Sequence, residues 1–196
     1  MSISSFACYN RSVNKQTLRQ FPVTTFYVGT TLIILLLAQV NLNWITPLVL
    51  FPAFWRLAPW TLFTYGLVHL QIFHWVLNMS VILFLGRYLE QYLGSIRYFV
   101  LISGGILAGG VLFAFINTAP AVGISAGGFA LIFFFGLKYP YRPELFLRLQ
   151  NWQFLLLLSG VSVLSILLGW LPGIAHDAHL AGALVGVIGY RLFDRT

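Results

Sequence analysis

The chain has 196 residues, of which 59% are hydrophobic and only 8% are charged, and its mean hydropathy is +0.88. Soluble domains carry about 25% charged residues, so this composition excludes an ordinary soluble domain and indicates a membrane protein. The formal net charge is +7. The single cysteine, Cys8, allows no internal disulfide.

Six apolar segments approach the roughly 20 residues that a membrane-spanning helix needs. They cover residues 23–41, 62–86, 96–116, 124–138, 152–170 and 176–193. Helices are expected because every backbone polar group in lipid must be paired within its own segment. We therefore predict an all-α membrane protein, with one six-helix domain over residues 22–196. No A-x-A-like cleavage site follows the first segment, so we expect a retained helix after the polar, basic residues 1–21.

The basic residues support a cytoplasmic N-terminus. With six spans, only Arg56 of the eleven lysines and arginines falls outside, and the other ten fall in cytoplasmic segments. This distribution is the positive-inside bias. The net charge therefore reports orientation in a lipid bilayer and does not indicate a nucleic-acid partner.

The segment NWITPLVLFPAFWRLAPW, residues 43–60, is apolar but contains three prolines, which break or kink helices. Its tryptophans favour the headgroup layer of the membrane. We expect an interfacial loop on the outer side, between the first and second helices.

Polar residues gather at one depth. The second, fourth and sixth spans all enter from the outer face, and the polar residues near their first turns are His69, His74, Asn78, Ser125, His176 and His179. Polar groups within spans are costly and are functional candidates by default. We expect His176 to line the water-accessible mouth of this cluster.

A serine hydroxyl is a weak nucleophile until an adjacent base takes its proton, and a neutral histidine can do so. The G-x-x-x-G spacing of Gly182 and Gly186 favours close helix packing, which would bring His179 to Ser125. Asp177 is expected to be a first-turn acid, stabilised by the helix dipole and directed away from His179. The residues therefore predict a Ser–His dyad.

A developing oxyanion needs fixed hydrogen-bond donors. The backbone amide of Ser125 and the side chains of His74 and Asn78 could supply them. Helical spacing places His74 and Asn78 on one face.

These motifs resemble the rhomboid family of intramembrane serine proteases. WRLAPWTLFTYGLVH resembles the family's Trp-Arg loop, with Trp55 and Arg56, and HLQIFHWVLNM resembles its H-x4-H-x3-N pattern. FLGRYLEQYLGS is similar to the segment that closes that region, with Gly86, Glu90 and Gly94. GIS, from Gly123 to Ser125, resembles the start of G-x-S-G, and AHLAGALVG at 178–186 matches A-H-x-x-G-x-x-x-G.

The resemblance implies that Ser125 is the nucleophile, that His179 is its base, and that His74 and Asn78 assist the oxyanion. Phe129 corresponds to an aromatic residue that stacks near the catalytic histidine. The substrates would be transmembrane segments of other proteins, cut near the outer surface. No cofactor and no metal is implied, and the six spans match the compact bacterial members, which suggests a bacterial inner membrane.

One position departs from the motif, because Ala126 stands where the family has glycine after the serine. We expect its methyl group to crowd the oxyanion or the substrate backbone, with Gly127 and Gly128 as candidates to relieve the crowding. This departure keeps open a proteolytically inactive rhomboid-like protein that binds membrane-protein clients.

Two other functions stay open. His74, His176 and His179 could form a metal site, although zinc normally takes four ligands and no cysteine lies nearby. A histidine relay could serve a proton-coupled transporter, although no paired repeats with interrupted helices are visible.

Overall fold

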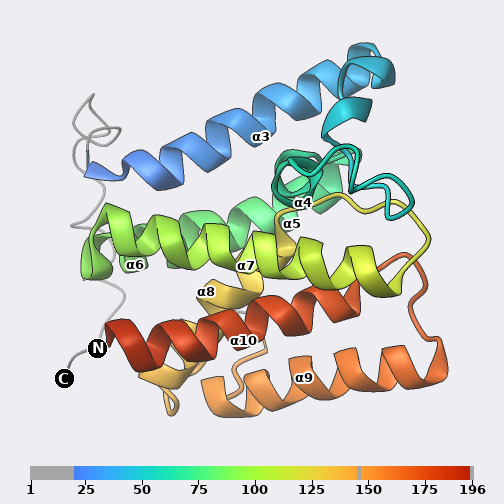
Figure 1. Ribbon diagram of the computed structural model, residues 1–196. Coiled ribbons are helices and arrows are strands. Elements are labelled where there is room, and N and C mark those ends of the chain that lie inside the picture. The colour runs from blue at the N-terminus through green and yellow to red at the C-terminus, as the bar shows by residue number, and fades with distance from the viewer. Residues whose placement is uncertain (1–19, 145–146, 195–196) are drawn as a thin grey trace.

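The computed structural model describes residues 20–144 and 147–194, so most of the predicted segment 1–21 lies outside the described residues. These residues form a bundle of helices (Figure 1). The principal helices are α3 (Pro22–Val40), α5 (Ile72–Val81), α6 (Arg87–Leu93), α7 (Ser95–Ile116), α8 (Ser125–Lys138), α9 (Asn151–Leu168) and α10 (His176–Phe193).

Within the part of the chain that the structure describes, four helices are long and apolar enough to cross a membrane. They are α3, α7, α9 and the continuous helix Ile72–Leu93, which joins α5 to α6 through a π-helical turn, Ile82–Gly86. α8 is a shorter apolar helix. The prediction of an all-α, multi-pass membrane protein is confirmed at this level.

The predicted start of the second span is wrong. The short helix α4 (Thr61–Thr64) and a 3-10 turn (Tyr65–Leu67) precede extended backbone at Val68, and the long helix begins only at Ile72. Tyr65, Leu67 and Val68, which precede Ile72, are buried in the protein, and the Tyr65 hydroxyl donates to the carbonyl of Ile106 on α7 at 2.9 Å. His69 therefore precedes the spanning helix. The helix also continues past the predicted end to Leu93, where Gly94 adopts a φ of +77°.

The loop between α3 and α4 follows the prediction that its prolines prevent a long helix. It forms two 3-10 turns, Leu42–Trp44 and Thr46–Leu48. Its Leu50 exchanges backbone hydrogen bonds of 3.3 and 2.9 Å with Ala121, in the loop between α7 and α8. Figure 1 shows the two loops together at one end of the bundle, opposite the start of α3.

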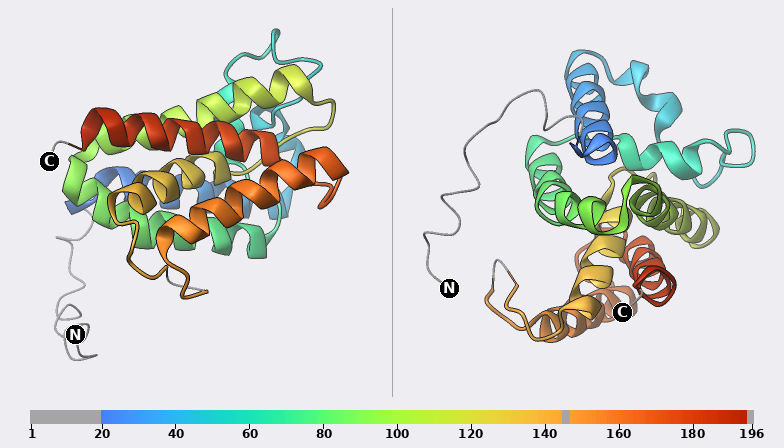
Figure 2. Two further views of the ribbon diagram at one scale, coloured as in Figure 1. Left: turned by 90° about the horizontal axis from the view of Figure 1, so that it is seen from below. Right: turned by 90° about the vertical axis from the view of Figure 1, so that its left-hand side faces the viewer.

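α8 is the central helix of the bundle. It contacts α5, α7, α9 and α10, and the right-hand view of Figure 2 shows it between α7 and α9. Glycines make the approach close: a Cβ atom added at Gly182 of α10 would lie 2.0 Å from the carbonyl oxygen of Ala126. One added at Gly105 of α7 would lie 2.8 Å from the Cβ of Ala130.

α3 lies at the edge of the bundle and is held at its first turn by Glu90. The Glu90 carboxylate accepts hydrogen bonds from the backbone amides of Val23 and Thr24, both at 2.9 Å. Ser95 donates a third, also at 2.9 Å. A carboxylate is stabilised at a helix N-terminus by the free N–H groups and the helix dipole.

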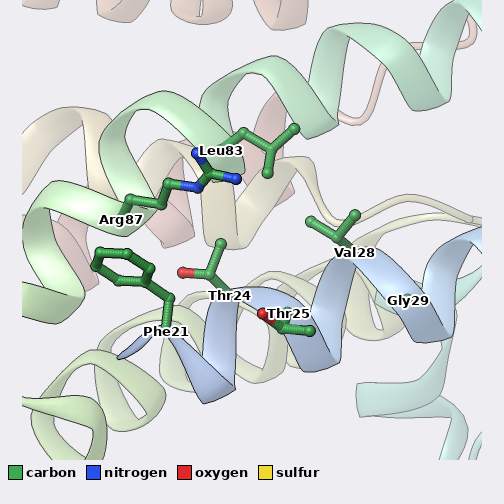
Figure 3. Close-up of a pocket in the computed structure, with 7 residues that line it drawn as sticks. All are labelled: Phe21, Thr24, Thr25, Val28, Gly29, Leu83 and Arg87. Atoms are coloured by element: carbon green, nitrogen blue, oxygen red, sulfur yellow. The ribbon is translucent and has the colours of Figure 1, made fainter. Parts of the chain in front are cut away.

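Next to this contact, α3 diverges from the Ile72–Leu93 helix. A cavity of about 230 Å³ separates them, lined in part by Phe21, Val28, Leu83 and Arg87 (Figure 3). A Cβ atom added at Gly29 would find nothing within 4 Å. The Glu90 contact is therefore an important attachment of α3 at this end.

We expect Glu90→Gln to lower the free energy of unfolding by about 2 kcal/mol, because hydrogen bonds to a buried charge contribute about 1.5–3 kcal/mol and an amide has a single acceptor oxygen. Thermal unfolding in detergent would measure the loss. Gln91→Ala, on the exposed side of the same helix, is the control. Equal midpoints for the two variants would contradict the capping role.

Candidate active site

Ser125 and His179 are in direct contact. Ser125 is the first residue of α8, and His179 lies in the first turn of α10. The Nε2 atom of His179 is 2.7 Å from the Oγ atom of Ser125, which is hydrogen-bonding distance. Both side chains are partly buried. Two residues far apart in the sequence thus form one serine–imidazole pair.

Phe129 fixes the orientation of the imidazole. It lies one turn after Ser125 on α8, and its ring stacks on that of His179 with centroids 4.3 Å apart and an interplanar angle of 14°. The close packing of Gly182 and Gly186 against α8 holds the same two helices together. The ring of His179 is therefore constrained by both neighbours.

Gly123 brings the ring of His74 close to the start of α8. Its φ is +116°, and an added Cβ atom would lie 2.7 Å from Cε1 and 3.0 Å from Nε2 of His74. The backbone amide of Gly123 donates to the carbonyl of Tyr65 at 2.9 Å. His74 therefore lies against the turn that precedes Ser125.

The amide of Asn78 is engaged within its own region. Its Nδ2 atom donates to the backbone carbonyl of His74 at 3.1 Å and lies 3.3 Å from Nε2 of the fully buried His69. The rings of His69 and His74 have centroids 5.1 Å apart. In this state Asn78 links His69 to α5, and its role as an oxyanion donor stays a prediction.

Other predicted residues lie apart from the pair. Arg56 is over the ring of Trp55, at 5.2 Å from the centroid, and Trp55 packs against Phe115 of α7. Glu90 holds α3, several turns along the helix from His74. These residues contribute packing and capping in the observed arrangement.

The methyl group of Ala126 is directed at α7. Ala126 is 1% exposed, and a Cβ atom added at Gly109 would lie only 2.6 Å from the Cβ of Ala126. The space for this methyl thus comes from Gly109. Gly127 instead packs against Ile102 and Ile106, and relief of the crowding by Gly127 and Gly128 stays a prediction.

The start of α10 also contacts α7. Asp177, in the first turn as predicted, is buried and accepts a hydrogen bond from Asn117, the residue that ends α7. His176 is only 7% exposed. Sequence reasoning missed Asn117, Gly109 and Tyr65, because none belongs to a recognisable motif.

Among the residues that the structure describes, no three His, Cys, Asp or Glu side chains are grouped so as to hold a metal ion.

The fold and this pair define a helical multi-pass membrane protein with a serine and a histidine in contact across two helices. A family model described as Rhomboid domain matches residues 56–195. The chain therefore belongs to the rhomboid family, and the resemblance seen in its motifs is confirmed.

Individual relatives differ in what their names say. The chain is 34% identical to RHOMBOID-like protein 1 of Arabidopsis thaliana over 66% of its own length and 33% of that relative. It is 28% identical to Inactive RHOMBOID-like protein 8 of the same plant, over 63% and 35% of the two chains. It is 26% identical to Rhomboid protease GlpG of Pectobacterium atrosepticum, over 92% and 66%. The chain thus spans about a third of the two plant relatives.

We expect Gly109→Ala to destabilise the protein by about 1–3 kcal/mol, the usual cost of overpacking a core. Ala126→Gly in the same chain should recover part of this loss, because it removes the nearest clash, with the Cβ of Ala126 at 2.6 Å. Recovery should be incomplete, because the hydroxyl of Tyr65 and the carbonyl of Ala178 would still lie 2.8 and 3.1 Å from the added atom. A double-mutant cycle of unfolding free energies measures the coupling. Strictly additive effects would mean that the two positions do not share this space.

Proposed function

We propose that this protein is an intramembrane serine endopeptidase in which Ser125 is the nucleophile and His179 is the general base. The observation that carries the proposal is the 2.7 Å contact between Oγ and Nε2. Membership of the rhomboid family and the relative named as a protease support it. We assign no acidic third member, since Asp177 accepts a hydrogen bond from Asn117.

In the proposed reaction, Nε2 of His179 takes the hydroxyl proton as Oγ of Ser125 bonds to the substrate carbonyl carbon. The carbonyl oxygen becomes an oxyanion, stabilised by the backbone amide of Ser125 and by His74, with Asn78 as a further donor once its present partners are exchanged. His179 then gives its proton to the leaving amine as the carbon–nitrogen bond breaks. Phe129 keeps the imidazole in one plane during both transfers.

The proposed topology has six spans, with α8 and α10 added to the four long apolar helices, over residues 22–196. The 14 residues of α8 extend only about 21 Å at about 1.5 Å per residue, against a hydrocarbon layer of about 30 Å. Ser125 would then lie below the outer surface, beneath the loop over residues 117–124. Irregular backbone is tolerated at such depth when protein satisfies it, as Leu50 and Tyr65 do here.

The proposed substrates are transmembrane segments of other membrane proteins, which reach the pair from the lipid bilayer. The proposed location is the inner membrane of a bacterium, with the N-terminus in the cytoplasm. Transmembrane proteins and lipid are the partners, and the chemistry needs no cofactor.

The second candidate is a proteolytically inactive rhomboid-like protein that binds membrane-protein clients. It is favoured by the relative named as inactive and by Ala126 at the motif glycine. The packing of the Ala126 methyl against α7 weakens that second reason. A fluorophosphonate probe separates the two functions, since only an activated serine is labelled.

We expect Ser125→Ala and His179→Ala each to reduce cleavage of a single-span substrate in liposomes by at least about 10³-fold. The nucleophile and its base act as one catalytic unit, so removing either residue abolishes most of the rate enhancement. Ser159→Ala is the matched control, since that hydroxyl donates to the carbonyl of Leu155 on its own helix. Cleavage by Ser125→Ala at the wild-type rate would eliminate the dyad mechanism.

We expect Gly123→Ala to lower kcat/KM by about 10²-fold, since a displacement of about 1 Å at a site has that effect. The new methyl would both strain a positive φ and push the ring of His74. Gly128→Ala is the control, because its added atom would meet Val81 at an ordinary 3.6 Å. Full activity of Gly123→Ala would show that the position of His74 is unimportant.

A further inference from the structure

A second cavity lies at the ends of α7 and α9 and the start of α10, and His176, three residues before His179, is part of its lining. Its volume is about 370 Å³, and its polar lining consists of Asn117, Ser165, His176 and Asp177. Asn117 ends α7, Ser165 lies near the end of α9, and the other two begin α10. The cavity therefore lies where the C-terminal ends of α7 and α9 meet the N-terminal end of α10.

Two buried side chains of this lining have no hydrogen-bond partner among the described residues. They are the hydroxyl of Ser165 and both ring nitrogens of His176, and the two residues are 3% and 7% exposed. Leaving such a group unpaired costs about 1–3 kcal/mol. Bound water is the usual partner of buried polar groups in a cavity that is roomy and polar.

His176 lies between this cavity and the imidazole of His179. It lines the cavity, and its ring meets that of His179 nearly edge-on, with centroids 6.0 Å apart and an interplanar angle of 83°. Phe129 covers a face of the His179 ring by stacking. His176 therefore adjoins both the cavity and the ring of the proposed base.

We propose that this cavity is a water site that supplies the hydrolytic water of the second half-reaction, with His176 as the positioning residue. This inference rests on the proposed function. In that step the water oxygen bonds to the carbonyl carbon of the acyl-enzyme while His179 takes one water proton. The bond from that carbon to Oγ of Ser125 breaks, and His179 returns the proton to Oγ.

Hydration of the cavity is testable without activity. In a Cys8→Ser background, which has no other cysteine, Ser165→Cys should react with a charged methanethiosulfonate about tenfold faster than Leu164→Cys, because only a hydrated thiol forms the reactive thiolate. Leu164 is adjacent on the same helix and 48% exposed on its outer surface. Equal rates at the two positions would overturn the water site.

The positioning role is tested with His176→Phe and His176→Gln. We expect His176→Phe to lower kcat about tenfold, with kcat/KM and the rate of fluorophosphonate labelling unchanged and with acyl-enzyme visible by mass spectrometry. His176→Gln, which keeps polar atoms for water, should recover much of kcat. A parallel fall in kcat/KM and labelling would overturn the role, because a structural defect impairs acylation as well.

The two proposals fail in different ways. A wild-type protein that neither cleaves nor is labelled would eliminate the endopeptidase, whatever the thiol rates are. An active wild type whose His176→Phe variant has an unchanged kcat would eliminate the water supply alone.

Discussion

The contact on which the rest of the structure depends is the approach of the α8 backbone to α7 and α10. In lipid there is little hydrophobic drive for one helix to join another, and close van der Waals packing has to supply the association. Gly182 and Gly105 supply it by presenting bare backbone to Ala126 and Ala130. A side chain at Gly182 would force the two helices apart, and the hydrogen bond between Ser125 and His179 would lengthen with them.

The two ends of the bundle are built differently. At one end, Glu90 fixes the first turn of α3 with a buried carboxylate. At the other, irregular backbone reaches inward and is paired with protein, through Leu50 with Ala121 and through Gly123 with Tyr65. The irregular backbone at this second end adjoins the catalytic candidates, since Gly123 lies two residues before Ser125 and against the ring of His74.

Much of this arrangement could be predicted from the sequence, because apolar length and the spacing of polar residues are local signals. The ends of α8 and α10 were predicted within about two residues. The start of the second long helix could not be predicted in this way. Apolar residues such as Tyr65 and Val68 are expected both in a helix that faces lipid and in a segment that is buried in protein. The partners of Asn78 depend on side-chain conformation, and the pairing of Asp177 with Asn117 joins two helices that share no motif. Such contacts are absent from any pattern within one segment.

Ala126 shows why a departure from a motif has to be weighed in three dimensions. Successive residues on a helix point about 100° apart, so the side chain after Ser125 cannot face α10 as Ser125 does. Here it faces α7, where Gly109 leaves room for one methyl group. The crowding anticipated from the motif alone concerns the oxyanion or the substrate backbone, whereas the methyl of Ala126 is buried against Gly109. Gly109 on α7 therefore provides the space that the methyl group of Ala126 occupies. The Ser125 hydroxyl still contacts His179, whose ring stacks on Phe129.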